Sequence, residues 1–148
     1  MTRMIFRNWL AWLIAAPVCL FALVPLTASA QTSAVKNKLV FQVSDAEPQK
    51  WNLALNNAKN VQDELGAGAV QIEIVVYGPG IGMLKQDSVA GNRVADALKA
   101  GVTIVACENT MTVQKLVKDD MLPAIGYVKA GVVELMKKQQ EGYAYIRP

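Results

Sequence analysis

One cysteine and one glycine-rich loop are the parts of this 148-residue sequence that could do chemistry. The sequence contains no histidine, which excludes a Ser-His-Asp triad, a Cys-His dyad and any imidazole metal ligand. It contains no CxxC pair either, so a thioredoxin-type dithiol and a zinc ribbon are both excluded. The strongest chemical candidate is therefore Cys107, whose thiolate would be a nucleophile.

Cys107 has two interpretations. It ends a short apolar run and precedes the polar segment Glu108-Asn109-Thr110, where backbone N–H groups can favour a thiolate. Glu108 would raise the thiol pKa, and Lys85 and Lys115 are the cations that could compensate if the fold brings them close. The alternative is an inert cysteine that packs the end of a strand as a small apolar side chain.

The glycine loop is the segment Gly78-Pro79-Gly80-Ile81-Gly82. It does not match GxGxxG, and no phosphate-loop lysine follows it. A tight exit from a strand, where glycine permits positive φ, is the favoured interpretation. The alternative is a backbone nest that binds an anion or a sulfur oxyanion.

Soft sulfur ligands raise a third possibility, a Cu(I) site. The candidates are Cys107, Met83, Met111 and Met121, but no methionine-rich run exists and helical methionine usually fills a core. The sequence therefore predicts neither a metal nor a cofactor. Asn52, Asn56 and Asn60 recur every four residues, which places them together on one face of a helix, either in solvent or in an oligomer contact.

Alternating strands and helices must position these residues. β-Branched runs predict strands, and apolar residues at three- and four-residue spacing predict helices between them. This alternation is typical of βαβ units with a parallel sheet, where ligands lie beyond the carboxyl ends of the strands. The glycine loop and Cys107 both fall at that edge. The predicted strands are 38–44, 70–77, 102–106, 125–128 and 143–146, and the predicted helices are 48–65, 88–101, 112–118 and 130–140.

The first 30 residues have the pattern of a secretory signal peptide. Arg3 and Arg7 precede an apolar stretch over 9–26, and Ala28-Ser29-Ala30 is a small-x-small cleavage site. We expect cleavage after Ala30 and a periplasmic location, with an uncleaved membrane anchor as the alternative. Residues 31–37 are then a flexible start, and 38–148 form a single domain.

Removal of this segment would leave a nearly neutral chain, because Arg3 and Arg7 go with it. Such a chain lacks the positive charge that nucleic-acid binding needs, and it would not be held at the membrane. Cys107 would be its one cysteine, since Cys19 lies within the apolar stretch. With one cysteine, the chain could not form an internal disulfide even in an oxidising compartment.

Several segments together resemble one family. They are Lys38-Leu-Val-Phe-Gln-Val-Ser-Asp45, Trp51-Asn-Leu-Ala-Leu-Asn-Asn-Ala58, the Gly78-Pro-Gly loop, Val105-Ala-Cys-Glu-Asn-Thr-Met111 and Gly142-Tyr-Ala-Tyr-Ile-Arg-Pro148. In this order they resemble the DsrE/DsrF-like family of small sulfur-relay proteins, over essentially all of 38–148.

The resemblance implies a three-layer α/β sandwich with a five-stranded, mainly parallel sheet flanked by helices. It implies a homo-oligomer, often a trimer or hexamer, and a cysteine that carries sulfur as a persulfide after a central strand. Cys107 matches that cysteine. The residues expected to shape a binding site around it are Gly78, Gly80, Glu108, Asn109 and Thr110.

Two hypotheses of function follow. The first is an exported sulfur carrier that holds sulfane sulfur on Cys107, with a sulfur donor or acceptor protein or a small sulfur compound as its partner. We expect a carrier rather than a turnover enzyme, because no general base is visible. The second is a non-catalytic module of the same fold that binds a small ligand or assembles into oligomers. The export signal departs from the cytoplasmic relatives, so the relay partners would have to differ.

Overall fold

The computed structural model describes residues 37–148. The expected signal peptide, its cleavage site after Ala30 and residues 31–36 of the expected flexible start lie outside the described residues. Within residues 37–148, no helix is both long enough and apolar enough to cross a membrane.

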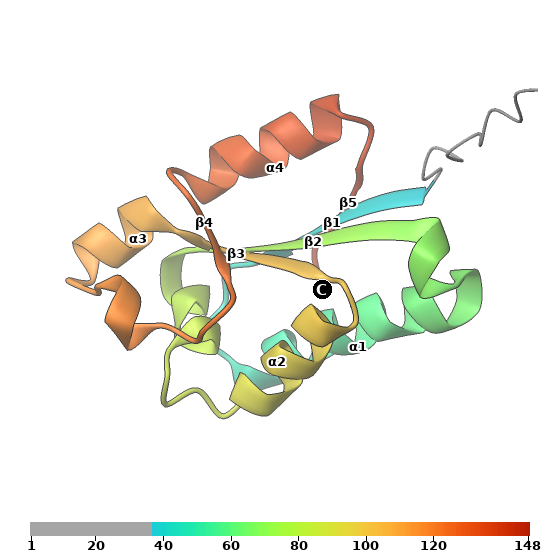
Figure 1. Ribbon diagram of the computed structural model, residues 1–148. Coiled ribbons are helices and arrows are strands. Elements are labelled where there is room, and N and C mark those ends of the chain that lie inside the picture. The colour runs from blue at the N-terminus through green and yellow to red at the C-terminus, as the bar shows by residue number, and fades with distance from the viewer. Residues whose placement is uncertain (1–36) are drawn as a thin grey trace, which may run out of the picture. The chain divides into compact units, whose positions relative to one another are not determined.

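A five-stranded sheet forms the centre of the domain, and every neighbouring pair of strands is parallel. The spatial order of the strands is β4-β3-β2-β1-β5 (Figure 1). This confirms the predicted α/β class, and the sheet is entirely rather than mainly parallel. The strands are β1 (Asn37–Val43), β2 (Val70–Val76), β3 (Thr103–Cys107), β4 (Gly126–Val128) and β5 (Ala144–Ile146).

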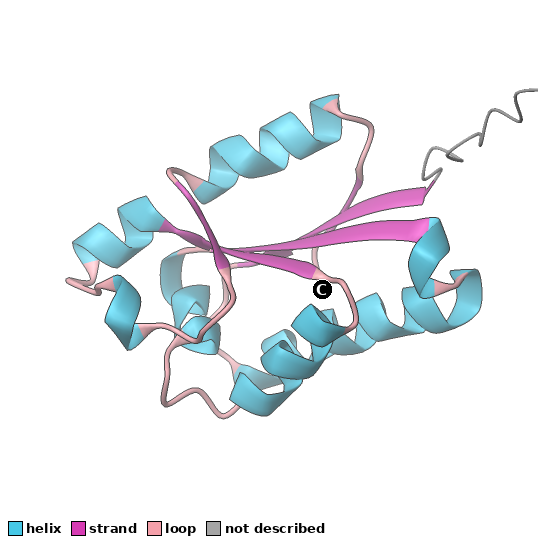
Figure 2. Ribbon diagram, in the orientation of Figure 1, coloured by secondary structure: helices cyan, strands magenta, loops and turns pink. Residues whose placement is uncertain are grey.

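Helices cover both faces of the sheet, as Figures 1 and 2 show. The chain moves from β1 through β2 and β3 to β4 in one direction, and then returns across the sheet to β5. Because such crossovers are right-handed, the returning helix α4 lies on the face opposite to α1 and α2. The helices are α1 (Pro48–Leu65), α2 (Gly91–Lys99), α3 (Glu108–Val113) and α4 (Gly131–Gln140).

Two apolar cores result, because alternate residues of each strand point to opposite faces. The larger core packs Phe41 and Ile74 of the sheet against Trp51 and Leu55 of α1. The smaller core lies under α4, and its buried members are Val40, Val75, Val105, Leu135 and Tyr143. In β3 the same alternation directs Ile104 and Ala106 into the larger core and Val105 toward α4. Cys107 lies two residues after Val105, so its side chain points to the same face of the sheet, toward α4.

Three 3₁₀ segments connect these elements: η1 (Ala67–Ala69), η2 (Gly78–Leu84) and η3 (Lys118–Asp120). The glycine loop forms most of η2. Gly80 is buried there, and a Cβ atom at Gly80 would lie 2.6 Å from the carbonyl oxygen of Val43. Glycine at this position therefore lets η2 lie directly against the end of β1.

The expectation of a loop at 108–110 and a helix over 112–118 is wrong. Residues Glu108–Val113 form α3, which begins directly after Cys107. Glu108 places a carboxylate in the first turn, where it interacts favourably with the helix dipole. The helix stops before Lys115, whose φ of 55° is incompatible with a continuing α-helix. Polar residues here mark the start of a helix rather than a loop.

Candidate functional site

Cys107 lies between the beginnings of two helices. It is the last residue of β3 and occupies the N-cap position of α3. The backbone N–H of Gly131, the first residue of α4, donates to the Cys107 sulfur over 3.3 Å. The sulfur also lies 3.9 Å from the carbonyl oxygen of Lys129. The side chain is 5% exposed, so the thiol is buried at the carboxyl edge of the sheet.

This environment favours the thiolate. Burial raises the pKa of the Cys107 thiol, but hydrogen bonds from the Thr110 hydroxyl and from the N–H groups of Gly131, Thr110 and Asn109 lower it. The hydrogen bonds prevail, and the pKa lies below the ordinary value of 9.0. A cysteine at the N-terminus of a helix is ionised more readily for this reason.

The cations that the sequence offered do not produce this effect. Neither Lys85 nor Lys115 is among the leading influences on the pKa of Cys107. Lys85 instead pairs its backbone with Met121 in an isolated bridge, and Lys115 is exposed beyond the end of α3. Neutral donors therefore stabilise the charge on the sulfur.

Thr110 connects the glycine loop to the cysteine. The N–H of Gly78, which has a φ of +54°, donates to the Thr110 hydroxyl oxygen over 2.9 Å. This bond uses a lone pair of the hydroxyl oxygen. The hydroxyl proton therefore remains to be donated to the Cys107 sulfur. The side chain of Gln114 closes the other side with a 3.3 Å bond to the carbonyl oxygen of Gly78.

A shallow groove of about 390 Å³ lies between η2 and α3. It brings together three of the predicted binding residues, Gly78, Asn109 and Thr110. Gly80 is buried against β1, and Glu108 is half-buried in the first turn of α3; neither lines the groove. The remaining lining residues are Pro79, Val113 and Gln114.

Sequence reasoning missed two residues at this site, Gly131 and Tyr77. A Cβ atom at Gly131 would lie 3.0 Å from the Tyr77 side chain, so glycine lets this ring pack on the start of α4. The pKa of Tyr77 is raised, first by burial and then by nearby charge, to which Cys107 contributes. The sequence places Gly131 at the same sheet edge as Cys107, because it follows a predicted strand, but it does not show that the two residues meet.

The methionines considered for Cu(I) lie elsewhere. Met83, Met111 and Met121 are all buried in the larger core, and Cys107 is not part of that cluster. Among the residues that the structure describes, no three His, Cys, Asp or Glu side chains are grouped closely enough to hold a metal ion.

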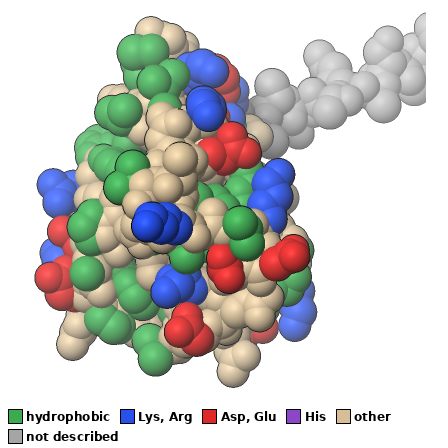
Figure 3. Space-filling view, turned by 90° about the vertical axis from the view of Figure 1, so that its left-hand side faces the viewer, with side chains coloured by type: hydrophobic (Ala, Val, Ile, Leu, Met, Phe, Trp, Pro, Cys, Tyr) green, Lys and Arg blue, Asp and Glu red, His purple; other side chains and the backbone are tan. Residues whose placement is uncertain are grey.

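The side of the molecule on which α3 lies carries mixed charge. Figure 3 shows Lys and Arg side chains interspersed with Asp and Glu on that side, without a continuous patch of one sign. Screened, alternating charges of this kind do not attract a polyanion over a distance.

Comparison with known proteins gives a family and a fold. The model of the DsrE/DsrF-like family matches residues 37–148. A solved structure of MTH1491, a protein of unknown function from Methanobacterium thermoautotrophicum, is 32% identical. The match covers 76% of this chain and 99% of that one, with a TM-score of 0.72.

A second solved structure extends the likeness of fold to a more distant protein. BT1422, a conserved protein of unknown function from Bacteroides thetaiotaomicron, is 17% identical with a TM-score of 0.62. That match covers 76% of this chain and 95% of the other. At this identity the likeness concerns the fold alone. No curated protein matches the sequence.

Proposed function

The chain belongs to the DsrE/DsrF-like family, and from this premise we propose that it carries sulfane sulfur as a persulfide on Cys107. The family is linked to sulfur relay, which makes a sulfur donor or acceptor the natural partner. The observation that carries the proposal is the environment of the Cys107 thiol. The Gly131 N–H is 3.3 Å from its sulfur, and hydrogen bonds hold its pKa below the ordinary value.

The proposed chemistry needs no oxidant, because sulfane sulfur already has the oxidation state that is transferred. The Cys107 thiolate attacks the outer sulfur of a donor persulfide or polysulfide. A new S–S bond forms on Cys107, the donor's S–S bond breaks, and its electron pair leaves with the donor thiolate. An acceptor thiolate then attacks the outer sulfur, and Cys107 leaves as a thiolate.

A low thiol pKa helps in both halves of this exchange. It raises the fraction of Cys107 that is ionised before the attack on the donor. It also makes Cys107 a better leaving group when the acceptor attacks. The N–H groups at the starts of α3 and α4 serve both roles, since they stabilise negative charge on the sulfur each time it forms.

A second candidate function is favoured by one observation, the burial of the thiol. At 5% exposure, Cys107 could simply pack between β3 and α4. The protein would then be a binding or assembly module. Under the carrier proposal, the residues that bury Cys107 must move aside for a donor to reach the sulfur.

We also propose that the protein is exported and acts as a homo-oligomer. The signal-peptide pattern ending at Ala30 supports export to the periplasm. Large apolar side chains on the outer surface of α4, Val132 at 64%, Val133 at 41% and Met136 at 50% exposure, support a surface that another subunit covers. A trimer or hexamer is the assembly that the resemblance to the family implies.

The proposal is tested by intact-mass measurement of protein prepared without reductant, before and after exposure to polysulfide. We expect a gain of about 32 Da per sulfur atom, removed by reductant and absent in Cys107→Ser. The same spectrum reports whether the chain starts at Gln31. If no adduct forms, and Cys107 reacts with iodoacetamide only after unfolding, the carrier proposal fails and the binding module replaces it.

A further inference from the structure

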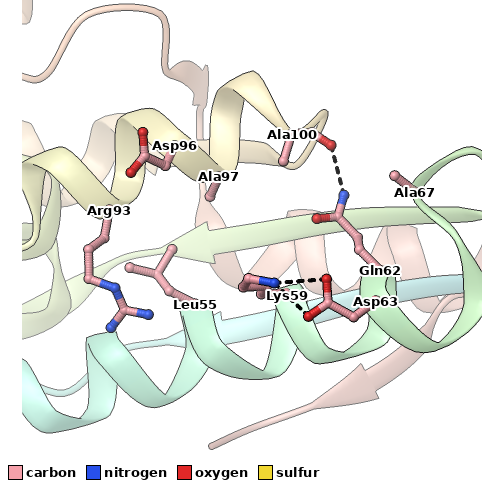
Figure 4. Close-up of a pocket in the computed structure, with 9 residues that line it drawn as sticks. All are labelled: Leu55, Lys59, Gln62, Asp63, Ala67, Arg93, Asp96, Ala97 and Ala100. Atoms are coloured by element: carbon pink, nitrogen blue, oxygen red, sulfur yellow. Dashed lines mark hydrogen bonds and ion pairs between the residues drawn. The ribbon is translucent and has the colours of Figure 1, made fainter.

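A second hollow lies on the α1 and α2 side of the sheet, away from the face toward which Cys107 points. It is a groove of about 400 Å³ between the two helices (Figure 4). Its floor includes the buried side chain of Leu55 and the half-buried Ala97. The full set of lining residues is Leu55, Lys59, Gln62, Asp63, Ala67, Arg93, Asp96, Ala97 and Ala100.

Arg93 stands at one end of this groove with its guanidinium directed toward α1 (Figure 4). Its two terminal nitrogens each donate over 2.5 Å to a side-chain amide oxygen, one of Asn52 and the other of Asn56. These amides belong to the four-residue asparagine repeat, so two of its three members hold an arginine rather than facing solvent alone. Amide oxygens are neutral and leave the positive charge of Arg93 uncompensated.

The other charges along the groove already have partners of opposite sign. Lys59 is paired with Asp63, with 2.5 Å between nitrogen and oxygen. Asp96 is paired with Lys99 over 3.7 Å. Within the described residues, Arg93 has no carboxylate within ion-pair distance. One positive charge is therefore left at the end of a largely apolar floor.

We propose that this groove binds a small organic acid with one negative charge and an apolar body. The carboxylate would pair with the N–H groups of Arg93 that the two asparagines leave free, on a planar guanidinium that these asparagines pre-orient. The apolar body would lie over Leu55 and Ala97 toward Ala100. The volume is at the lower end of the range for small-molecule sites.

The charge arrangement also selects against larger anions. A nucleotide or another polyphosphate needs several cations, and this groove offers one that is unpaired. Asp63 and Asp96 on its rim would repel additional negative charge. A ligand with an apolar chain and a single carboxylate matches both the one unpaired positive charge, Arg93, and the apolar floor.

Calorimetric titration of the purified protein with octanoate tests this proposal, with octanol as the uncharged probe. We expect saturable binding of octanoate, and binding of octanol that is weaker by about tenfold or more. Arg93→Gln should lower the affinity for octanoate to that for octanol. Lys50→Gln is the matched control, because it removes one exposed positive charge from α1 outside the groove, and it should leave binding unchanged.

Arg93 also ties α2 to α1, so thermal unfolding of Arg93→Gln must show that the variant is folded. Ala97→Leu provides an independent variant, since it fills the floor and leaves Arg93 in place; it should abolish binding of octanoate. Equal affinity for octanoate and octanol, equal effects of Arg93→Gln and Lys50→Gln, or unchanged binding in Ala97→Leu would each overturn the proposal. Cys107→Ser should bind octanoate normally, so this test is independent of the sulfur-carrier proposal.

Discussion

At the scale of single residues, Thr110 is the link between the glycine loop and the thiol. Its hydroxyl oxygen accepts the N–H of Gly78, and its hydroxyl is the first among the groups that lower the pKa of Cys107. The glycine loop therefore acts on the cysteine through Thr110. This is a different role from the anion-binding nest that the loop could have formed by itself.

Replacing Thr110 tests this role. We expect Thr110→Val to raise the pKa of Cys107, because valine has nearly the same shape but donates no hydrogen bond. Thr110→Ser keeps the hydroxyl and should leave the pKa close to that of the unaltered protein. The ultraviolet absorbance of the thiolate as a function of pH measures the change. Coincident titrations of the two variants would show that the hydroxyl does not control the thiol.

How far this site could be predicted also depends on single residues. Cys107 is predictable, because a cysteine that ends a β-branched run of a parallel sheet must lie at the carboxyl edge. Its partner Gly131 is 24 residues away, and the contact exists only because β4 lies beside β3. Pairing of strands depends on packing across the whole sheet, which periodicity in the sequence does not contain.

At the scale of elements, α4 is joined to the sheet by a buried ion pair. Lys138 of α4 lies 3.2 Å from the carboxylate of Glu73 on β2, whose side chain is 8% exposed. The second carboxylate oxygen of Glu73 is buried and has no hydrogen-bond partner. Burial raises the pKa of Glu73 above its ordinary value, although Lys138 acts in the opposite direction.

Removing the lysine from this pair should weaken the attachment of α4. We expect Lys138→Met to lower the free energy of unfolding at pH 7 by about 3 kcal/mol, because it leaves a buried carboxylate without its cation. Lys137→Met is the matched control on an exposed position of the same helix, and it should change stability by less than about 0.5 kcal/mol. Urea unfolding of the three proteins measures both effects.

The pH dependence of this loss has a definite sign. Without Lys138 the pKa of Glu73 rises further, because the main influence that lowered it is gone. The loss of stability is then complete above that raised pKa, where the carboxylate is charged. It shrinks as the pH falls through that pKa and the group becomes neutral. A loss that stays constant or grows on acidification would show that the ion pair is not its cause.

The 3₁₀ segment η2 depends on glycine at one position. We expect Gly80→Ala to lower the free energy of unfolding by about 2 kcal/mol, because its Cβ atom would meet the backbone of Val43 and force the segment outward. Gly68→Ala is the control, since nothing lies within 4 Å of a Cβ atom there. Thermal unfolding compares them, and similar midpoints would contradict the close approach of η2 to β1.

Sequence periodicity was sufficient for the long elements and failed for a short one. The apolar stripe through Trp51, Ala54 and Ala58 predicts α1, because eighteen residues give the pattern several turns in which to repeat. Helix α3 has six residues and one buried side chain, Met111, so it shows no period. In its first turn the backbone N–H of Asn109 donates to the carbonyl of Lys129 across the sheet edge, a long-range contact that no local pattern contains.

At the scale of the whole molecule, the direction of the chain explains the position of the thiol. Connections from β1 to β3 cover one face, and α4 covers the other, so the ends of β3 and β4 send the chain to different sides. Cys107, at the end of β3, therefore meets the N-terminus of α4 where the two paths of the chain separate. Alternation of strands and helices predicts this class of fold, but the return of β5 to the side of β1 could not be read from its three residues.

The outer surface of α4 leads to the last prediction, which concerns assembly. Val132, Val133 and Met136 lie three and four residues apart on this helix and are 64%, 41% and 50% exposed. If the proposed homo-oligomer buries this surface, Met136→Lys should reduce the mass in light scattering to that of one chain, because a buried unpaired ammonium is costly. Val89→Lys changes an even more exposed apolar residue, at 79%, and should leave the assembly intact. A monomeric parent protein would contradict the proposed homo-oligomer. Dissociation by both substitutions alike would show that α4 is not the specific subunit contact.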